Sequence, residues 1–324
     1  MLELFRKNIF LNMVLLLPYI VLVRLGTLIF PSRYYYSYDE GNVLLEYVYG
    51  IITTPISQSI LSIVLIYIQT LYINRISINN KLALDVSYFA GVLYVLFTSL
   101  TPDIASFSPI LIANTFVLLA VSNLFKTYKN LTAKIQIFNV GFFLSIAAYF
   151  HKPYIFFFLF AFIGLMILRS FKWHERLQYF SGYAVFIFLV SGLYFSMGIK
   201  ISDSLQGSFT QFGLVKFQSI TLSEGITLGV FSLMLAFIIL NYNTYIGKKN
   251  IQVQKMIDLL YWLLLASLPM ALFSSEIFIV ELKVLAIGMS MLFALTLSAN
   301  KNVLTNEFIH IIFLGIITYT HLFH

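Results

Sequence analysis

The stretch IFLNMVLLLPYIVLVRLGTLIF, residues 9–30, decides the fold class of this chain. A membrane-spanning helix needs about 20 consecutive, mostly apolar residues, and this stretch is that long with one charge, Arg24. It is too long for the apolar core of a signal peptide, and it has no small-residue cleavage site. We therefore predict an uncleaved first membrane span, preceded by the basic residues Arg6 and Lys7.

Similar apolar runs recur along the whole chain, which is 60% hydrophobic and only 10% charged. A soluble domain has roughly 45–50% apolar and 25% charged residues. Because the runs are continuous and do not alternate, helices rather than a barrel satisfy the backbone in lipid. We predict an all-α, polytopic transmembrane bundle of about eleven spans. The expected spans are Ile9–Phe30, Pro55–Ile73, Leu84–Leu100, Ile104–Phe125, Ile135–Phe150, Tyr154–Leu168, Gln178–Met197, Ile226–Tyr245, Met256–Phe273, Ile277–Leu297 and Phe308–His321.

The loops between these runs are short, so residues 1–324 are expected to form a single transmembrane domain. The chain contains no cysteine, which excludes a disulfide framework, a thiolate metal site and a cysteine nucleophile. Its net charge of +7 is spread in small basic clusters between apolar segments. This dispersal is typical of topology signals and argues against nucleic acid as a partner.

The distribution of lysine and arginine predicts the orientation in the membrane. Most of them lie in the N-terminal segment and in every second loop, and cytoplasmic loops are enriched in these residues. The opposite loops contain only Arg33, Lys152, Lys200 and Lys216. We therefore expect a cytoplasmic N-terminus, an outer C-terminus, and an outer position for the loops 31–54, 101–103 and 151–153.

The first outer stretch, PSRYYYSYDEGNVLLEYVYGIITT at residues 31–54, is dense in acidic, basic and aromatic side chains. The apolar residues after Asn42 recur at helical spacing, which predicts an amphipathic helix from Asn42 to about Ile52 along the outer surface. Pro55 favours a break before the second span. The acids Asp39 and Glu40 precede this helix, where a carboxylate could take a proton from a hydroxyl. The alternative is a solvated turn within an interfacial tyrosine belt.

Three further charges lie inside predicted spans, where an unpaired charge costs several kcal/mol. They are Arg24 in the first span and Glu281 and Lys283 near the outer end of the tenth. Each is a candidate for binding a substrate. An internal pair, Arg24–Glu281 or Glu281–Lys283, that only fixes helix packing is the alternative.

Two outer turns also carry polar residues. Asp103 follows Thr101 and Pro102, and His151-Lys152-Pro153 makes a tight turn. A basic residue is disfavoured on this side, so Lys152 is better explained as a ligand of a lipid-linked phosphate, with a snorkelling lysine as the alternative. The histidines are scattered without ligand spacing, which leaves only Asp39, Glu40 or Asp103 for a hard divalent cation. The sequence does not establish a cofactor.

These motifs resemble the GT-C superfamily of integral-membrane glycosyltransferases, in particular bacterial enzymes that use polyprenyl-phosphate sugars. The similar features are Tyr38-Asp39-Glu40-Gly41 after the first span, Asp103 in the second outer loop, and His151-Lys152-Pro153 before the sixth span. The resemblance covers residues 1–176, and 177–324 would be additional spans. In the third motif, His151 replaces a threonine and the usual glycine is absent. Residues 131–176 also resemble an uncharacterised multi-span inner-membrane family of Bacteroidota.

The resemblance implies an enzyme of the bacterial inner membrane that transfers a sugar from a polyprenyl-phosphate donor to an acceptor on the outer face. Asp39 would be the general base, and Glu40 or Asp103 would bind a metal or substrate hydroxyls. Lys152 would hold the donor phosphate with Arg33 and Arg24, and His151, Glu281 and Lys283 would complete the substrate site. The alternatives are a flippase that uses Arg24, Glu281 and Lys283 as its path, or a non-catalytic subunit of an envelope complex. The sequence predicts membrane lipids and a lipid-linked sugar as partners but no oligomeric state.

Overall fold

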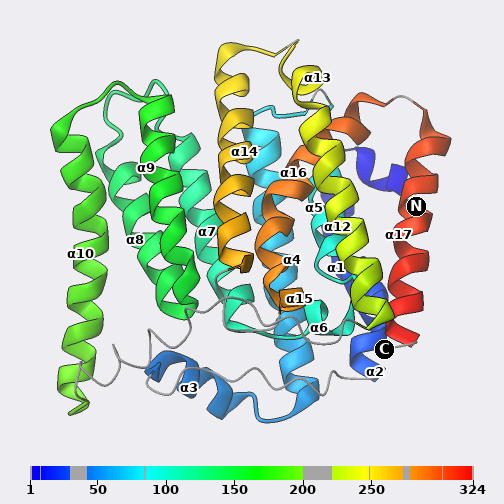
Figure 1. Cartoon of the computed structure of the whole chain (residues 1–324), viewed down its shortest axis with the longest axis horizontal. Coiled ribbons are helices and arrows are strands. Elements are labelled where there is room, and N and C mark those ends of the chain that lie inside the picture. The colour runs from blue at the N-terminus through cyan, green and yellow to red at the C-terminus, as the bar shows by residue number, and fades with distance from the viewer. Residues whose placement is uncertain are drawn as a thin grey trace.

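The computed structural model describes residues 2–7, 9–29, 42–83, 85–199, 221–247, 249–272, 278–300 and 302–322, with residue 278 described by its backbone alone. Within these ranges the chain is helical and has no strand, which confirms the predicted all-α class. Figure 1 shows the helices side by side, with successive long helices running in opposite directions. The first half contains η1 (Leu2–Arg6, a 3-10 helix), α1 (Phe10–Val23), α2 (Leu25–Ile29), α3 (Val43–Ile51), α4 (Pro55–Asn79), α5 (Phe89–Phe97), α6 (Pro102–Ala105), α7 (Pro109–Phe125), α8 (Lys134–Phe150), η2 (Lys152–Ile155) and α9 (Phe156–Leu168). The second half contains α10 (Trp173–Ser196), α12 (Leu222–Leu240), α13 (Tyr242–Ile246), α14 (Ile251–Leu272), α15 (Phe278–Glu281), α16 (Lys283–Ala299) and α17 (Val303–Leu322).

The apolar helices of the described chain are those of a multi-pass membrane protein. Six segments are long and apolar enough to cross a bilayer: α4, α10, α12, α14, α15 with α16, and α17. Each predicted span coincides with at least one helix. However, α1, α7, α8 and the unit formed by η2 and α9 are shorter apolar helices, and α5 has only 9 residues.

Several predicted spans are not continuous helices, contrary to expectation. The first is interrupted at Arg24, the fourth between α6 and α7, the eighth at Asn241 and the tenth at Leu282. A broken helix at membrane depth is tolerated only where other groups satisfy the freed backbone. Arg24 donates to the Ala105 carbonyl of α6 and Lys283 to the Ser106 carbonyl, so three of these breaks meet at one end of the bundle.

The predicted break between the surface helix and the second span is confirmed. The Asn42 side chain caps α3 by accepting a hydrogen bond from the Leu45 N–H at 3.2 Å. Thr54 is extended, with φ −100° and ψ 146°, and forms a capping box with Ser57 around Pro55 at the start of α4. The helix α3 is therefore separate from α4, and Figure 1 shows it lying across the lower end of the bundle.

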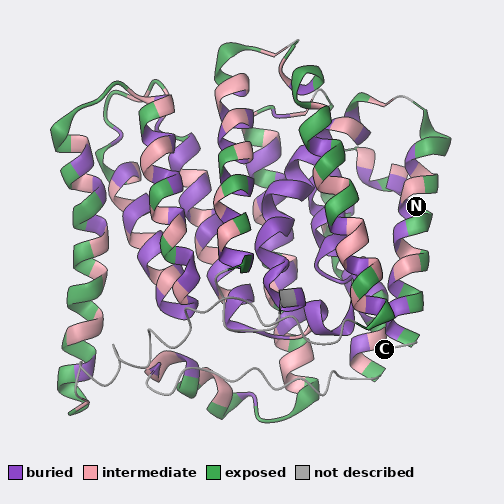
Figure 2. Cartoon of the chain, in the orientation of Figure 1, coloured by how far each residue is buried: buried purple, intermediate pink, exposed green. Residues whose placement is uncertain are grey.

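The core of the bundle surrounds α16. Of the apolar window that covers α15 and α16, 94% is buried, against 17% of the window in α10. Figure 2 shows this contrast, with α16 and α5 buried at the centre and exposed residues along α10, α12 and α17. The rim helices thus turn apolar side chains away from the protein, as lipid-facing helices do.

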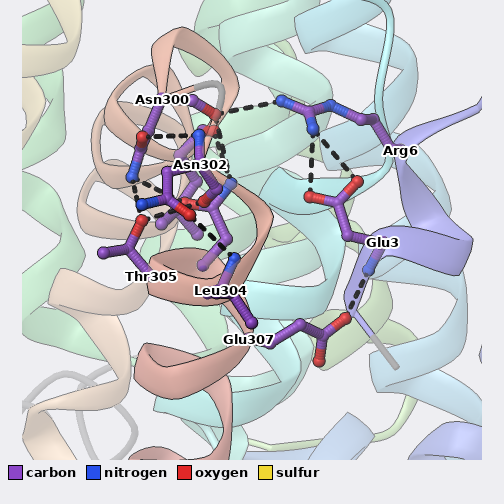
Figure 3. Close-up of polar contacts among 9 residues, drawn as sticks. Glu3, Arg6, Asn300, Asn302, Leu304, Thr305 and Glu307 are labelled. Carbon is purple, nitrogen blue, oxygen red and sulfur yellow. Dashed lines mark hydrogen bonds and ion pairs between the residues drawn. The ribbon is translucent and has the colours of Figure 1, made fainter.

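The two ends of α17 are fixed at opposite ends of the bundle. Near its start, the Glu3 backbone N–H donates to Glu307 Oε1 at 3.0 Å, and Arg6 bonds both Glu3 and the Asn300 carbonyl. Figure 3 shows these contacts, which attach η1 to the turn between α16 and α17. At the other end, His321 Nε2 lies 3.0 Å from the Ser99 carbonyl, which follows α5.

Two glycines let α8 and α10 pack backbone to backbone. A methyl group on Gly141 would overlap the Tyr179 carbonyl oxygen, and one on Gly182 would overlap the Phe138 carbonyl oxygen. Because backbone atoms cannot rotate away, only glycine permits this spacing. The same helix contains Gly192, where an added methyl group would meet nothing within 4 Å.

We expect Gly182→Ala to lower the free energy of unfolding by about 2–3 kcal/mol, because the new methyl group forces α8 and α10 apart. Gly192→Ala is the matched control on the same helix and should leave stability unchanged or slightly raised. Thermal unfolding in a mild detergent, followed by circular dichroism, measures both variants. Equal unfolding midpoints for the two variants would contradict the tight packing of α8 against α10.

Candidate functional site

Arg24 is the centre of a buried polar network at the lower end of the bundle. It is 1% exposed, and its side chain reaches the connection between α5 and α6. Nη2 donates to the Thr98 carbonyl at 2.7 Å and Nε to Ser99 Oγ at 3.0 Å. Nη1 donates to Ser62 Oγ at 2.5 Å and to the Ala105 carbonyl at 2.8 Å. Four of the five guanidinium N–H groups are thus directed at protein oxygens.

Asp103 is 2% exposed on the short helix α6. Thr101 caps this helix by accepting from the Ile104 N–H, and Pro102 occupies its first turn. Ser106 Oγ donates to the Asp103 carbonyl at 2.6 Å and so closes the turn after α6. The carboxylate is therefore held in a rigid turn, and it is not the solvated loop residue that an isolated turn acid would be.

Lys283 and Glu281 flank the break between α15 and α16, and both are fully buried. The Lys283 ammonium donates to the Ser106 carbonyl at 2.8 Å and to Ser108 Oγ at 2.7 Å. Glu281 Oε2 lies 3.1 Å from His151 Nε2, and His151 is itself 2% exposed. These bonds differ from the Arg24–Glu281 and Glu281–Lys283 pairs considered above.

The five charged or titratable side chains form one electrostatic group. Lys283 interacts with Arg24, Asp103 and Glu281, and Glu281 is bonded to His151. With histidine neutral, two cations and two carboxylates balance, which reduces the cost of burying them. The sequence-predicted residues of four separate spans are therefore brought together at one end of the bundle.

Two asparagines that the sequence analysis did not select join this group to its surroundings. Asn114 of α7 accepts from the Tyr154 hydroxyl at 2.6 Å and donates to the Lys283 carbonyl at 3.2 Å. Asn42 donates to the Tyr149 carbonyl at 2.8 Å and so fixes the start of α3 against the end of α8. An amide inside an apolar span and an asparagine directly before a helix were the available signals.

Lys152 lies beside this second contact. It is the first residue of η2, is half-buried, and its ammonium is 5.6 Å from the centre of the Tyr149 ring. The predicted residues Arg33, Asp39 and Glu40 lie outside the described part of the chain. Among the described residues, no group of three or more His, Cys, Asp or Glu side chains could hold a metal ion.

Comparison with known proteins leaves this site without a relative: no family model, curated protein or solved structure matches the chain.

Proposed function

We propose that this protein is a membrane glycosyltransferase that takes a sugar from a polyprenyl-phosphate donor. It transfers the sugar to an acceptor hydroxyl at the outer face of the bacterial inner membrane. In this proposal the lower end of the bundle in Figure 1 is the outer end, α3 lies in the lipid interface, and the shorter apolar helices also cross the membrane. The basic loops at the other end, such as those with Lys126 and Arg169, are then cytoplasmic.

The observation that carries the proposal is the hydrogen bond from Asn42 to the Tyr149 carbonyl. Glu40 precedes Asn42 by two residues, so covalent connectivity keeps their Cα atoms within about 8 Å of each other. Lys152 follows Tyr149 by three residues. The acids that the proposal uses as base and the lysine that it uses for phosphate are therefore tethered to one hydrogen-bonded point, although more than 100 residues separate them (|i−j| = 107 for the bond itself).

The reaction follows from these groups. The acceptor hydroxyl attacks the anomeric carbon while Asp39 takes its proton, and the bond from that carbon to the phosphate oxygen breaks. Polyprenyl phosphate leaves with the bonding electrons, and the Lys152 ammonium stabilises its growing charge. Glu40 or Asp103 binds sugar hydroxyls or a divalent cation. His151, oriented by Glu281, lies next to Lys152 in the chain and contributes to the donor site.

The buried cations have a more structural part in the proposal than the sequence suggested. Arg24 directs most of its donors at protein oxygens, and Lys283 is bonded to the turn after α6. We therefore place the first contact with donor phosphate at Lys152 and Arg33. Arg24 and Lys283 hold the broken helices that shape the site.

Lys152→Ala is expected to weaken binding of a polyprenyl-phosphate sugar by about tenfold at low salt and by less at high salt, because part of the lost attraction is screened. Lys152→Arg should restore binding only in part, since a planar guanidinium does not reproduce a compact ammonium. Lys126→Ala, at the opposite end, is the matched control. The assay supplies purified protein with a panel of polyprenyl-phosphate sugars and measures both binding and sugar release.

Sugar release by the wild-type protein supports the transferase. Movement of the intact donor between leaflets of proteoliposomes without sugar release would instead support the flippase. Binding unchanged in Lys152→Ala would contradict the assigned phosphate site.

A further inference from the structure

A second site lies at the end of the bundle opposite the buried charges. A groove of about 560 Å³ lies between the starts of α8 and α10. Lys134, Lys172 and His174 line it, and all three side chains are exposed. Its volume is in the range of pockets that hold small molecules.

The groove has a net positive charge. Glu175 also lines it, but its two carboxylate oxygens accept from Arg169 Nε at 2.8 Å and Nη2 at 2.6 Å. This bidentate hydrogen bonding raises the pKa of Arg169 and keeps the pair ionised. Because Arg169 compensates Glu175, the two lysines are left to attract an anion.

The backbone at the groove also favours an anion. Ala133 and Lys172 are the N-cap residues of α8 and α10, both line the groove, and neither makes a side-chain cap hydrogen bond. The first N–H groups of two long helices are thus left without a side-chain cap beside the lysines. Helix N-termini carry a partial positive charge and bind phosphate groups.

The surroundings of the groove are apolar, which points to an amphipathic ligand. Leu131 and Leu177 line the groove and are 96% and 61% exposed. Phe171 and Trp173 stand beside it as an exposed, edge-to-face pair with ring centres 5.3 Å apart. Aromatic residues of this kind mark the level of lipid headgroups. Below the groove, α10 exposes an apolar surface over its whole length, as Figure 2 shows.

We propose that this groove binds the phosphate headgroup of an anionic phospholipid, with Lys134 and Lys172 contacting the phosphate and the acyl chains lying along α10. A soluble phosphate would use the same lysines but would gain nothing from the apolar face. The proposal is independent of the sugar-transfer function, since it concerns the other end of the bundle.

The test compares two variants that remove the same charge. Native mass spectrometry of the detergent-solubilised protein measures binding of phosphatidylglycerol, phosphatidylcholine and inorganic phosphate. Wild type should bind phosphatidylglycerol in preference to phosphatidylcholine, and Lys134→Gln with Lys172→Gln should weaken that binding by about tenfold. Lys7→Gln with Lys126→Gln removes two exposed lysines elsewhere and should leave it unchanged.

Equal weakening by both double variants would reduce the effect to general charge and overturn the site. So would equal binding of the two lipids, or displacement of phosphatidylglycerol by inorganic phosphate at similar concentration. A phosphatidylglycerol with a photoreactive acyl chain provides a second measurement in membranes. It should label the α10 segment 177–196 in wild type and less in the groove variant, and uniform labelling of all rim helices would overturn the proposed position.

Discussion

Arg24→Met is expected to lower the free energy of unfolding by about 3 kcal/mol or more, the largest loss of stability that we predict for a single side chain. The substitution keeps a long apolar stem but removes every donor of the guanidinium. The carbonyls of Thr98 and Ala105 then lose the bonds that Arg24 gives them in a buried site. Because α5, α6 and α7 are short and are joined by these turns, the loss should spread to the packing of this end of the bundle.

Arg75→Met is the matched control, since Arg75 is exposed on α4 at the other end. Arg24→Lys should recover part of the loss, because one ammonium cannot reach all four acceptors. Unfolding midpoints in detergent, followed by circular dichroism, compare the three variants. If Arg24→Met were as stable as Arg75→Met, Arg24 would not be the anchor that its hydrogen bonds indicate.

Asp39→Asn is expected to reduce sugar transfer by about 10²–10⁴-fold, the usual contribution of a positioned general base. Asparagine has the same shape but cannot accept the proton of the acceptor hydroxyl. Binding of the donor should be nearly unchanged, because the proposal assigns the phosphate to Lys152. The measurement is the rate of sugar release from a donor that the wild-type protein accepts, together with the affinity for that donor.

Asp85→Asn is the control for this experiment, because Asp85 is an exposed aspartate outside the site. Its transfer rate should equal that of wild type. A wild-type rate in Asp39→Asn would remove Asp39 from catalysis, and a loss of donor affinity without a loss of rate would make it a binding residue.

The sequence was sufficient to locate the helices, because a run of apolar residues long enough to cross lipid is a signal that neighbouring segments do not alter. Pro55 also predicted the break before α4, since proline restricts the residue before it. The interruptions at Arg24 and Leu282 were not predicted. A hydropathy pattern averages over a full helix, whereas these breaks depend on carbonyls that distant side chains satisfy.

The membership of the buried group was predicted better than its bonding. Arg24, Asp103, His151, Glu281 and Lys283 were selected because charge is costly inside a span. The partners are mostly hydroxyl and carbonyl groups of the turn after α5, such as Thr98 and Ser106. Sequence spacing cannot identify such partners, since they come together only when separate helices pack.

The central claim is that the Asp39-Glu40 segment and the Lys152 turn form one site. Because the chain has no cysteine, Asp39→Cys with Lys152→Cys introduces the only two thiols. A short bifunctional thiol reagent should link them in membranes, and a polyprenyl-phosphate sugar should slow the reaction. The control, Asp39→Cys with Lys126→Cys, should remain unlinked across the thickness of the bundle. If the Asp39→Cys and Lys152→Cys thiols each react singly with a maleimide but never link to each other, the shared site is contradicted.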